Sequence, residues 1–176
     1  MKNTIIILMM MFSCSSFSQE KPDSLRMPSK DGRVEISEVI IVNNKKSAEL
    51  FSDALLFIAE NYNSPQTVTR LSDRTSGKLL VNTFFVVSDY FHIKCILELD
   101  IKDGKYKYVF KDFTYQVVVE SLKGDLAPKA QAFDTVFPSK NYKDPNVYTK
   151  LAIGTLDSIN LLITNLKKTM SKNDSF

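Results

Sequence analysis

Apolar side chains fall at every second position through the middle of the chain, which predicts β-structure. Between residues 91 and 101, apolar side chains occupy the odd positions and mostly polar ones the even positions. A strand points successive side chains to opposite faces, so this pattern indicates one face against a core and one toward solvent. Similar runs rich in β-branched and aromatic residues predict further strands at 33–42, 67–72, 78–87 and 106–119.

Two details refine the last pair of strands. Asp103-Gly104 predicts a tight hairpin, because both residues accept the positive φ angles of a two-residue loop. In the strand that follows, the aromatic residues change from even positions, up to Phe110, to odd positions, from Phe113. A β-bulge near Lys111-Asp112 is expected to restore the register and to bend the strand.

Apolar residues at intervals of three and four predict two helices. The first is expected to have Ser47 as its N-cap and Glu49 in its first turn, and to end within Asn61 to Pro65. Its predicted apolar face consists of Phe51, Leu55, Ile58 and Tyr62. The second follows Asp144-Pro145, an N-cap with proline at the first helical position. Its predicted apolar face consists of Ala152, Leu156, Ile159, Ile163, Leu166 and Met170, and Lys167, Lys168 and Lys172 lie where the C-terminus of a helix favours cations.

The order of these elements predicts one α+β domain over residues 32–172. We expect an antiparallel sheet of about five strands, in the order β-α-β-β-β-β-α, with two helices packed on one face. Residues 121–143 contain Pro128 and Pro138 and show little periodicity. For this connection the pattern leaves open a short helix or an edge strand.

The N-terminus has the features of an export signal. Lys2 precedes the apolar run Ile5 to Phe12, which is much shorter than the roughly 20 apolar residues that span a bilayer. Ser16 and Ser18 suit cleavage before Gln19, giving a signal peptide at 1–18, a polar flexible leader at 19–31, and a periplasmic or secreted protein. The alternative is lipidation of Cys14, which would anchor the protein to the outer membrane.

Composition excludes several classes of protein. After cleavage at Gln19 only Cys95 remains, so no intramolecular disulfide is expected. The net charge of the whole chain is only +3, and its cations are interspersed with acids, which argues against nucleic acid as a partner. A membrane is an expected partner only if Cys14 is lipidated.

The sequence offers little catalytic chemistry. His92 is the only histidine and lies on the polar side of its strand, while Cys95 falls on the core side. A hydrolase would have to combine His92 with a nearby carboxylate or hydroxyl, such as Asp89. Asp100 and Asp103 fit a solvated charge pattern with the neighbouring lysines better than a calcium site. No phosphate-binding glycine loop and no zinc ligand set is apparent, so no cofactor or metal is predicted.

The second face of the sheet is the candidate binding surface. We expect both helices to cover the face that carries Leu79, Val81, Phe85, Ile93, Leu97, Tyr106 and Tyr108. Phe84, Ile96 and Val109 then point the other way and form a small ligand or partner surface, or are scattered surface apolar residues.

Three segments resemble a known family: the helix start Ser47 to Phe51, the turn Asp73 to Gly77, and above all Lys102 to Tyr108 with its Lys-Asp-Gly turn. They resemble the bacterial domain-of-unknown-function family numbered 4468, which has a TATA-binding-protein-like fold. The resemblance covers about Val34 to Tyr115 and implies an exported protein of the Bacteroidetes type. Members often have tryptophan in the first helix, whereas this chain has none. The resemblance implies no catalytic residues.

The expected function is that of an exported cell-envelope binding module without catalysis. Its ligand would be an envelope protein, a glycan or a small apolar molecule, bound on the open sheet face or between the sheet and the C-terminal helix. The alternatives are a hydrolase that uses His92 and a lipid-anchored structural component of the envelope.

Overall fold

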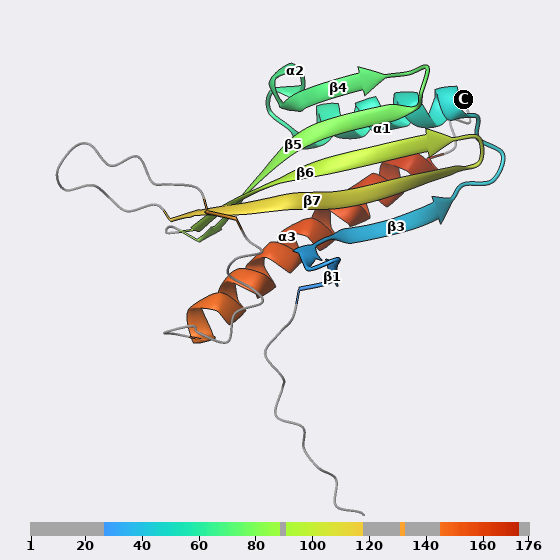
Figure 1. The fold of residues 1–176 in the computed structure, drawn as a ribbon. Coiled ribbons are helices and arrows are strands. Elements are labelled where there is room, and N and C mark those ends of the chain that lie inside the picture. Colours follow the sequence, from blue (N-terminus) through green and yellow to red (C-terminus); the bar gives the residue numbers. More distant parts are fainter. Residues whose placement is uncertain (1–26, 89–90, 118–130, 133–144, 173–176) are drawn as a thin grey trace, which may run out of the picture.

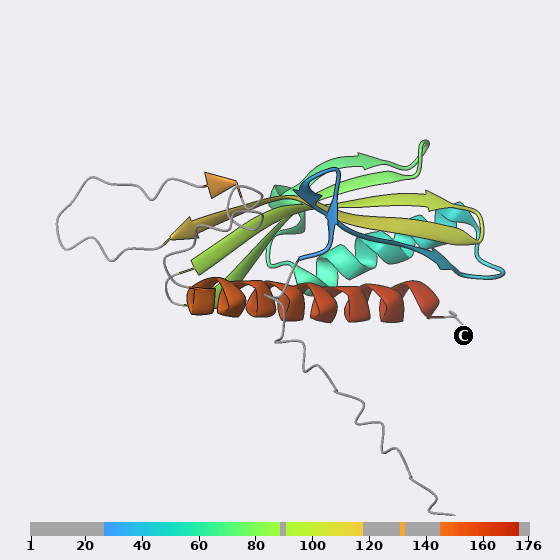
Figure 2. The ribbon, with the colours of Figure 1, turned by 60° about the horizontal axis from the view of Figure 1, so that its bottom comes forward.

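A twisted antiparallel sheet lies on two long helices (Figure 1) in the computed structural model, which describes residues 27–88, 91–117, 131–132 and 145–172. The main strands are β3 (Ile36–Ile41), β4 (Thr69–Asp73), β5 (Lys78–Ser88), β6 (Phe91–Lys102) and β7 (Lys105–Val117). The long helices are α1 (Ser47–Asn61) and α3 (Pro145–Ser171). The strand order is β3-β7-β6-β5-β4, and both helices lie on the same side of the sheet (Figure 2). The predicted α+β fold is confirmed.

Four short elements complete the described chain: β1 (Ser29–Lys30), β2 (Arg33–Val34), α2 (Pro65–Val68) and β8 (Gln131–Ala132). The strand expected at 33–42 is divided into β2 and β3, and β2 pairs with β1. Met27 is buried and Ser29–Lys30 form β1, and both lie within the segment 19–31 expected to be a leader. The strand expected at 67–72 starts only at Thr69, after the short helix α2. In the 121–143 connection, β8 pairs with β7 as an edge strand, while the signal peptide expected at 1–18 lies outside the described residues.

Helix α1 begins one residue earlier than the expected cap implies. Lys46 is the N-cap and Ser47 is the first helical residue, so the prediction of Ser47 as N-cap is wrong. Glu49 stabilises this end by accepting a hydrogen bond from the Lys46 N–H at 2.8 Å. Leu55 is exposed, and the buried face consists of Leu50, Phe51, Ala54, Phe57 and Ile58.

The hairpin and the bulge both form where the pattern places them. Lys102 pairs directly with Lys105, which leaves a two-residue loop. Within it only Gly104 has a positive φ, of 73°, so Asp103 does not need the conformation expected of it. Lys94 pairs with Thr114 and Ile96 with Lys111, so one residue of β6 faces two of β7, and Asp112 takes a φ of 55°. The predicted bulge is therefore confirmed.

The core lies between the sheet and the helices. Every sheet residue expected on the helix side is buried, and along α3 the predicted apolar face is buried except for Leu156, which is half-buried. Hydrophobic burial of this continuous layer is the main favourable term for folding. Among the described helices, none is long and apolar enough to cross a membrane.

Candidate functional site

The sheet face opposite the helices presents apolar side chains at one end. Phe84 and Val86 on β5 are 50% and 61% exposed. On β6, the His92 ring packs edge-on against the Phe84 ring, with 5.0 Å between their centroids. These three side chains form a small exposed cluster, which we call the Phe84 patch.

The other two predicted surface residues do not join this patch. Ile96 is half-buried, and Val109 is only 6% exposed, so the expectation that Val109 is exposed is wrong. Val109 lies on a central strand, directly opposite Ser37 on one side and Glu98 on the other. On its own strand the longer side chains of Lys107 and Lys111 stand on the same face, and lysine stems cover apolar neighbours in this way.

Ion pairs occupy the centre of the same face. Glu98 pairs with Lys111 and lies 3.7 Å from the Lys78 ammonium, which also contacts Asp100 at 3.2 Å. The hydrogen bond to Asp100 raises the pKa of Lys78. These groups satisfy one another. Among the described residues, no cluster of histidine, cysteine and acidic side chains suits a metal ion.

The Lys-Asp-Gly turn of the family resemblance performs a structural task. The Asp103 carboxylate accepts a hydrogen bond of 2.7 Å from the Ser47 N–H and so stabilises the start of α1. This bond lowers the pKa of Asp103. The backbone of Gly104 bonds in both directions: its N–H donates to Lys45 and its carbonyl accepts from Val42. The hairpin tip therefore fastens β6 and β7 to the connection between β3 and α1.

The second motif, the turn at 73–77, is structural as well. The Asp73 carboxylate accepts hydrogen bonds from the backbone N–H groups of Thr75 and Ser76 and from the Ser76 hydroxyl. The bond from the Ser76 hydroxyl contributes most to the lowered pKa of Asp73. Gly77 accepts a bond of 2.8 Å from the Ile101 N–H and takes a φ of 69°. The Asp103-Gly104 tip and the 73–77 turn, which belong to two of the three segments that carry the family resemblance, thus hold the fold together.

The residues considered for catalysis are not brought together. No hydrogen bond joins His92 to a carboxylate or hydroxyl of the part of the chain that the structure describes, and Asp89 lies outside that part. Cys95 is buried on the helix side of β6, and burial raises the pKa of its thiol, which makes it a poor nucleophile. Asp100 and Asp103 also diverge, because Asp100 bonds to Lys78 while Asp103 turns toward α1.

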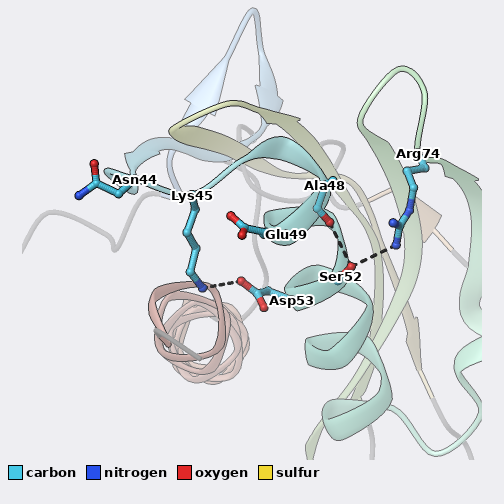
Figure 3. A pocket seen from close by; sticks show the side chains of 7 residues that line it. All are labelled: Asn44, Lys45, Ala48, Glu49, Ser52, Asp53 and Arg74. Atoms are coloured by element: carbon cyan, nitrogen blue, oxygen red, sulfur yellow. Dashed lines mark hydrogen bonds and ion pairs between the residues drawn. The ribbon is translucent and has the colours of Figure 1, made fainter. Parts of the chain in front are cut away.

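A hollow of about 540 Å³ lies beside the start of α1 (Figure 3). Its charged groups already have hydrogen-bond partners within the protein. The Lys45 ammonium bonds to Asp53 at 2.6 Å and to the carbonyl oxygens of Met170 and Lys172 at the end of α3. Arg74 donates to the Ser52 hydroxyl at 3.1 Å. We therefore interpret this hollow as part of the scaffold. Lys45 is important for that scaffold, but its two carbonyl partners at the end of α3 are more than 120 residues away along the chain, so no local pattern identifies it.

Hydrogen-bonded side chains connect the sheet to α3. The Tyr108 hydroxyl donates to Glu38 at 2.6 Å, and the Lys167 ammonium donates to the same carboxylate at 2.7 Å. The bond from Lys167, followed by that from Tyr108, lowers the pKa of Glu38. The neighbouring Tyr106 hydroxyl is buried and has no hydrogen-bond partner among the described residues. This packed layer offers less room for a ligand than the open face does.

Comparisons with known proteins agree with this architecture. Residues 37–116 match the family model described as a domain of unknown function (DUF4468) with TBP-like fold. The structure is similar to that of a TBP-like protein from Parabacteroides distasonis, with 18% identity and a TM-score of 0.66 over 84% of this chain and 98% of that chain. It is also similar to a DUF4468 family protein from Bacteroides ovatus, with 14% identity and a TM-score of 0.62 over 85% and 93% of the two chains. The search of curated proteins gave no match. Residues 37–116 are therefore a domain of the DUF4468 family, and the chain has the TBP-like fold that the family description names.

Proposed function

We propose that this chain is an exported binding module without catalytic activity, which holds a protein or glycan of the cell envelope on the open face of its sheet. The observation that carries the proposal is the Phe84 patch. The Phe84 ring is half exposed on the sheet face, beside the exposed Val86. A ligand that buries this apolar area gains favourable free energy of binding.

The shape of the surface favours a macromolecular ligand. Small molecules usually bind in concave pockets that bury most of their surface, whereas Phe84 and Val86 project from a strand. Together they form a small patch of a size that ordinary monomers expose, so we expect weak or transient binding. Export is proposed from the apolar run Ile5 to Phe12 and the cleavage site before Gln19.

The test compares Phe84→Ser with Leu161→Ser. Leu161 is 64% exposed on α3, on the helical side of the molecule, so it is a control of similar exposure. Full burial of a phenylalanine side chain contributes about 1.5–3 kcal/mol, and Phe84 is already half buried, so Phe84→Ser should weaken binding roughly 3- to 10-fold. Envelope fractions passed over wild type and both variants should yield ligands that Phe84→Ser loses and Leu161→Ser retains. Equal retention by all three folded proteins would exclude the patch as the binding surface.

Mass spectrometry of the mature N-terminus tests the export route separately. A chain that begins at Gln19 supports release by signal peptidase, and a lipidated Cys14 supports membrane anchoring. A chain that retains Met1 and the apolar run would refute export.

A further inference from the structure

The edge strand β3 has a free side with unpaired backbone groups. The Val42 N–H donates to Gly104 at 2.8 Å on the β7 side. Along an antiparallel strand, residues that bond to one neighbour alternate with residues that point away from it. Ile36, Glu38 and Ile40 therefore bond to β7, and the N–H and C=O groups of Ser37, Val39 and Ile41 point outward. Among the residues that the structure describes, no backbone group pairs with them.

Among the described residues this edge has no bulge and no proline, and its one inward-pointing charge, Glu38, is neutralised by its bonds to Lys167 and Tyr108. Proteins guard edge strands with bulges, prolines or inward-pointing charges. The opposite edge, β4, has a register shift between Thr69 and Leu71, whereas β3 pairs with β7 without interruption from Ile36 to Ile41. Val39 and Ile41 are 54% and 63% exposed on the open face. Figure 1 shows β3 at the margin of the sheet.

Three lysines stand beside this edge without counter-charges. Lys102 and Lys105 lie directly opposite each other, and Lys107 follows on the same face of β7. Like charges in directly opposed positions destabilise a sheet. No ion pair of the described residues involves any of the three, because Asp100, which faces Lys107, bonds to Lys78 instead. We call Lys102, Lys105 and Lys107 the lysine trio.

Two of the trio, Lys105 and Lys107, lie next to the exposed residues of β3, and Lys102 is one strand farther away on β6. Lys105 is directly opposite Ile41, and Lys107 is directly opposite Val39. A strand added to β3 would lie two strand spacings, roughly 10 Å, from β7. At that distance, long acidic side chains on the open face of the added strand can reach the ammonium groups of Lys105 and Lys107 over Val39 and Ile41.

We infer that the outer edge of β3 accepts an extended acidic segment of another protein, which adds to the sheet as an antiparallel strand and pairs its carboxylates with the lysine trio. The backbone groups of Ser37, Val39 and Ile41 supply the affinity that strand addition provides in general. The charges select the occupant. The β3 strand of a second copy would bring only Ser37, Val39 and Ile41 to this face and no carboxylate, while an acidic strand compensates the lysines. Glu38 points to the helix side, so carboxylates are favoured only on alternate residues of the partner.

The site is separate from the Phe84 patch, so each can be tested alone. The probe is a labelled synthetic peptide of alternating valine and glutamate, with an alternating valine and lysine peptide as its counterpart. We expect the acidic peptide to bind the mature chain, the basic peptide not to bind, and the affinity to fall as salt rises. Binding of both peptides with equal affinity would overturn the inference.

Three variants separate strand addition from simple charge attraction. Val39→Pro removes one outward N–H and leaves the hydrogen bonds to β7 in place. It should lower the affinity for the acidic peptide about tenfold. Lys105→Glu with Lys107→Glu should weaken it by at least as much. Lys94→Glu is the matched control, an exposed lysine farther along the same face, and should change affinity by less than about twofold.

Hydrogen exchange provides a readout that needs no variant. The amides of Ser37, Val39 and Ile41 should exchange rapidly in the free protein and become protected when the acidic peptide is bound. One result would refute strand addition: charge reversal abolishes binding of the acidic peptide, Val39→Pro leaves its affinity unchanged, and the three amides gain no protection. The surface would then bind anions such as acidic glycans. If the free protein is a dimer that Val39→Pro converts to a monomer, a second copy occupies the edge and the inference is equally refuted.

Discussion

The replacement Gly77→Ala should destabilise this protein more than alanine at its other positive-φ glycines. An ideal Cβ built on Gly77 would lie 2.2 Å from the backbone carbonyl oxygen of Ile101. That carbonyl cannot rotate away, since the Ile101 N–H is bonded to Gly77 and the residue continues β6. A left-handed φ costs a non-glycine residue about 1–2 kcal/mol, and forced overpacking adds about 1–3 kcal/mol. We expect a loss of about 2–5 kcal/mol in the free energy of unfolding.

Two other glycines serve as controls. Gly32 has a φ of 77° with no atom within 4 Å of an added Cβ, and Gly104 has a φ of 73° with only the Val42 carbonyl oxygen, at 4.0 Å. Alanine at either position should lower the free energy of unfolding only by the cost of its left-handed φ, about 1–2 kcal/mol. Urea denaturation of the three variants measures the difference in their free energies of unfolding, provided that the dependence on urea concentration is the same for all three. If Gly77→Ala is no less stable than Gly32→Ala and Gly104→Ala, the contact with Ile101 does not constrain the turn, and the structural interpretation of the 73–77 motif fails.

Three further outcomes are expected. Lys45→Met should lower the free energy of unfolding by about 2–3 kcal/mol, because it leaves the mostly buried Asp53 carboxylate unpaired. Adding Asp53→Leu should restore part of this loss in the same denaturation assay. If the effects of the two replacements are fully additive, the pairing is refuted. The pKa values of Asp73 and Asp103 are lower in the folded protein than in the unfolded chain, so their contribution to stability is complete above about pH 5 and is lost as the pH falls further. Asparagine at both positions should therefore lower the free energy of unfolding at pH 7 and make its decrease between pH 5 and pH 2 less steep. A decrease as steep as that of the wild type would contradict this. The Cys95 thiol should resist a thiol reagent in the native mature chain and react after denaturation, whereas rapid native labelling would show that the core opens.

Much of the sheet could be predicted because its physical causes are local. Strict alternation assigned the residues of β5 and β6 to their faces, since only one face is buried. The bulge was predictable for the same reason. The core-facing aromatic residues change parity between Phe110 and Phe113, and only an extra residue in β7 keeps both on the buried side.

The errors arise where contacts distant in sequence decide the outcome. Ser47 resembles a helix cap, but the Asp103 carboxylate from a hairpin 56 residues away bonds to its N–H. Lys45 has no local signature, because one of its partners is the Met170 carbonyl, 125 residues away. Val109 shows another limit: strand alternation predicts which face a side chain occupies, while its exposure depends on the neighbours that cover it.

The two proposed surfaces lie at opposite ends of the same strands. His92, in the Phe84 patch, and Lys102, in the lysine trio, are ten residues apart on β6, which at about 3.4 Å per residue is roughly 30 Å. This separation is several times the Debye length of about 8 Å at physiological ionic strength, so a charge change at one end should not alter binding at the other electrostatically. A partner that spans both surfaces would therefore lose affinity from variants at either end, whereas two separate partners would each respond to one. Asp103 and Gly104 at the hairpin tip and the 73–77 turn serve the fold, so the specificity of this chain should lie in the side chains of the open face and the β3 edge, Lys105 and Lys107 included.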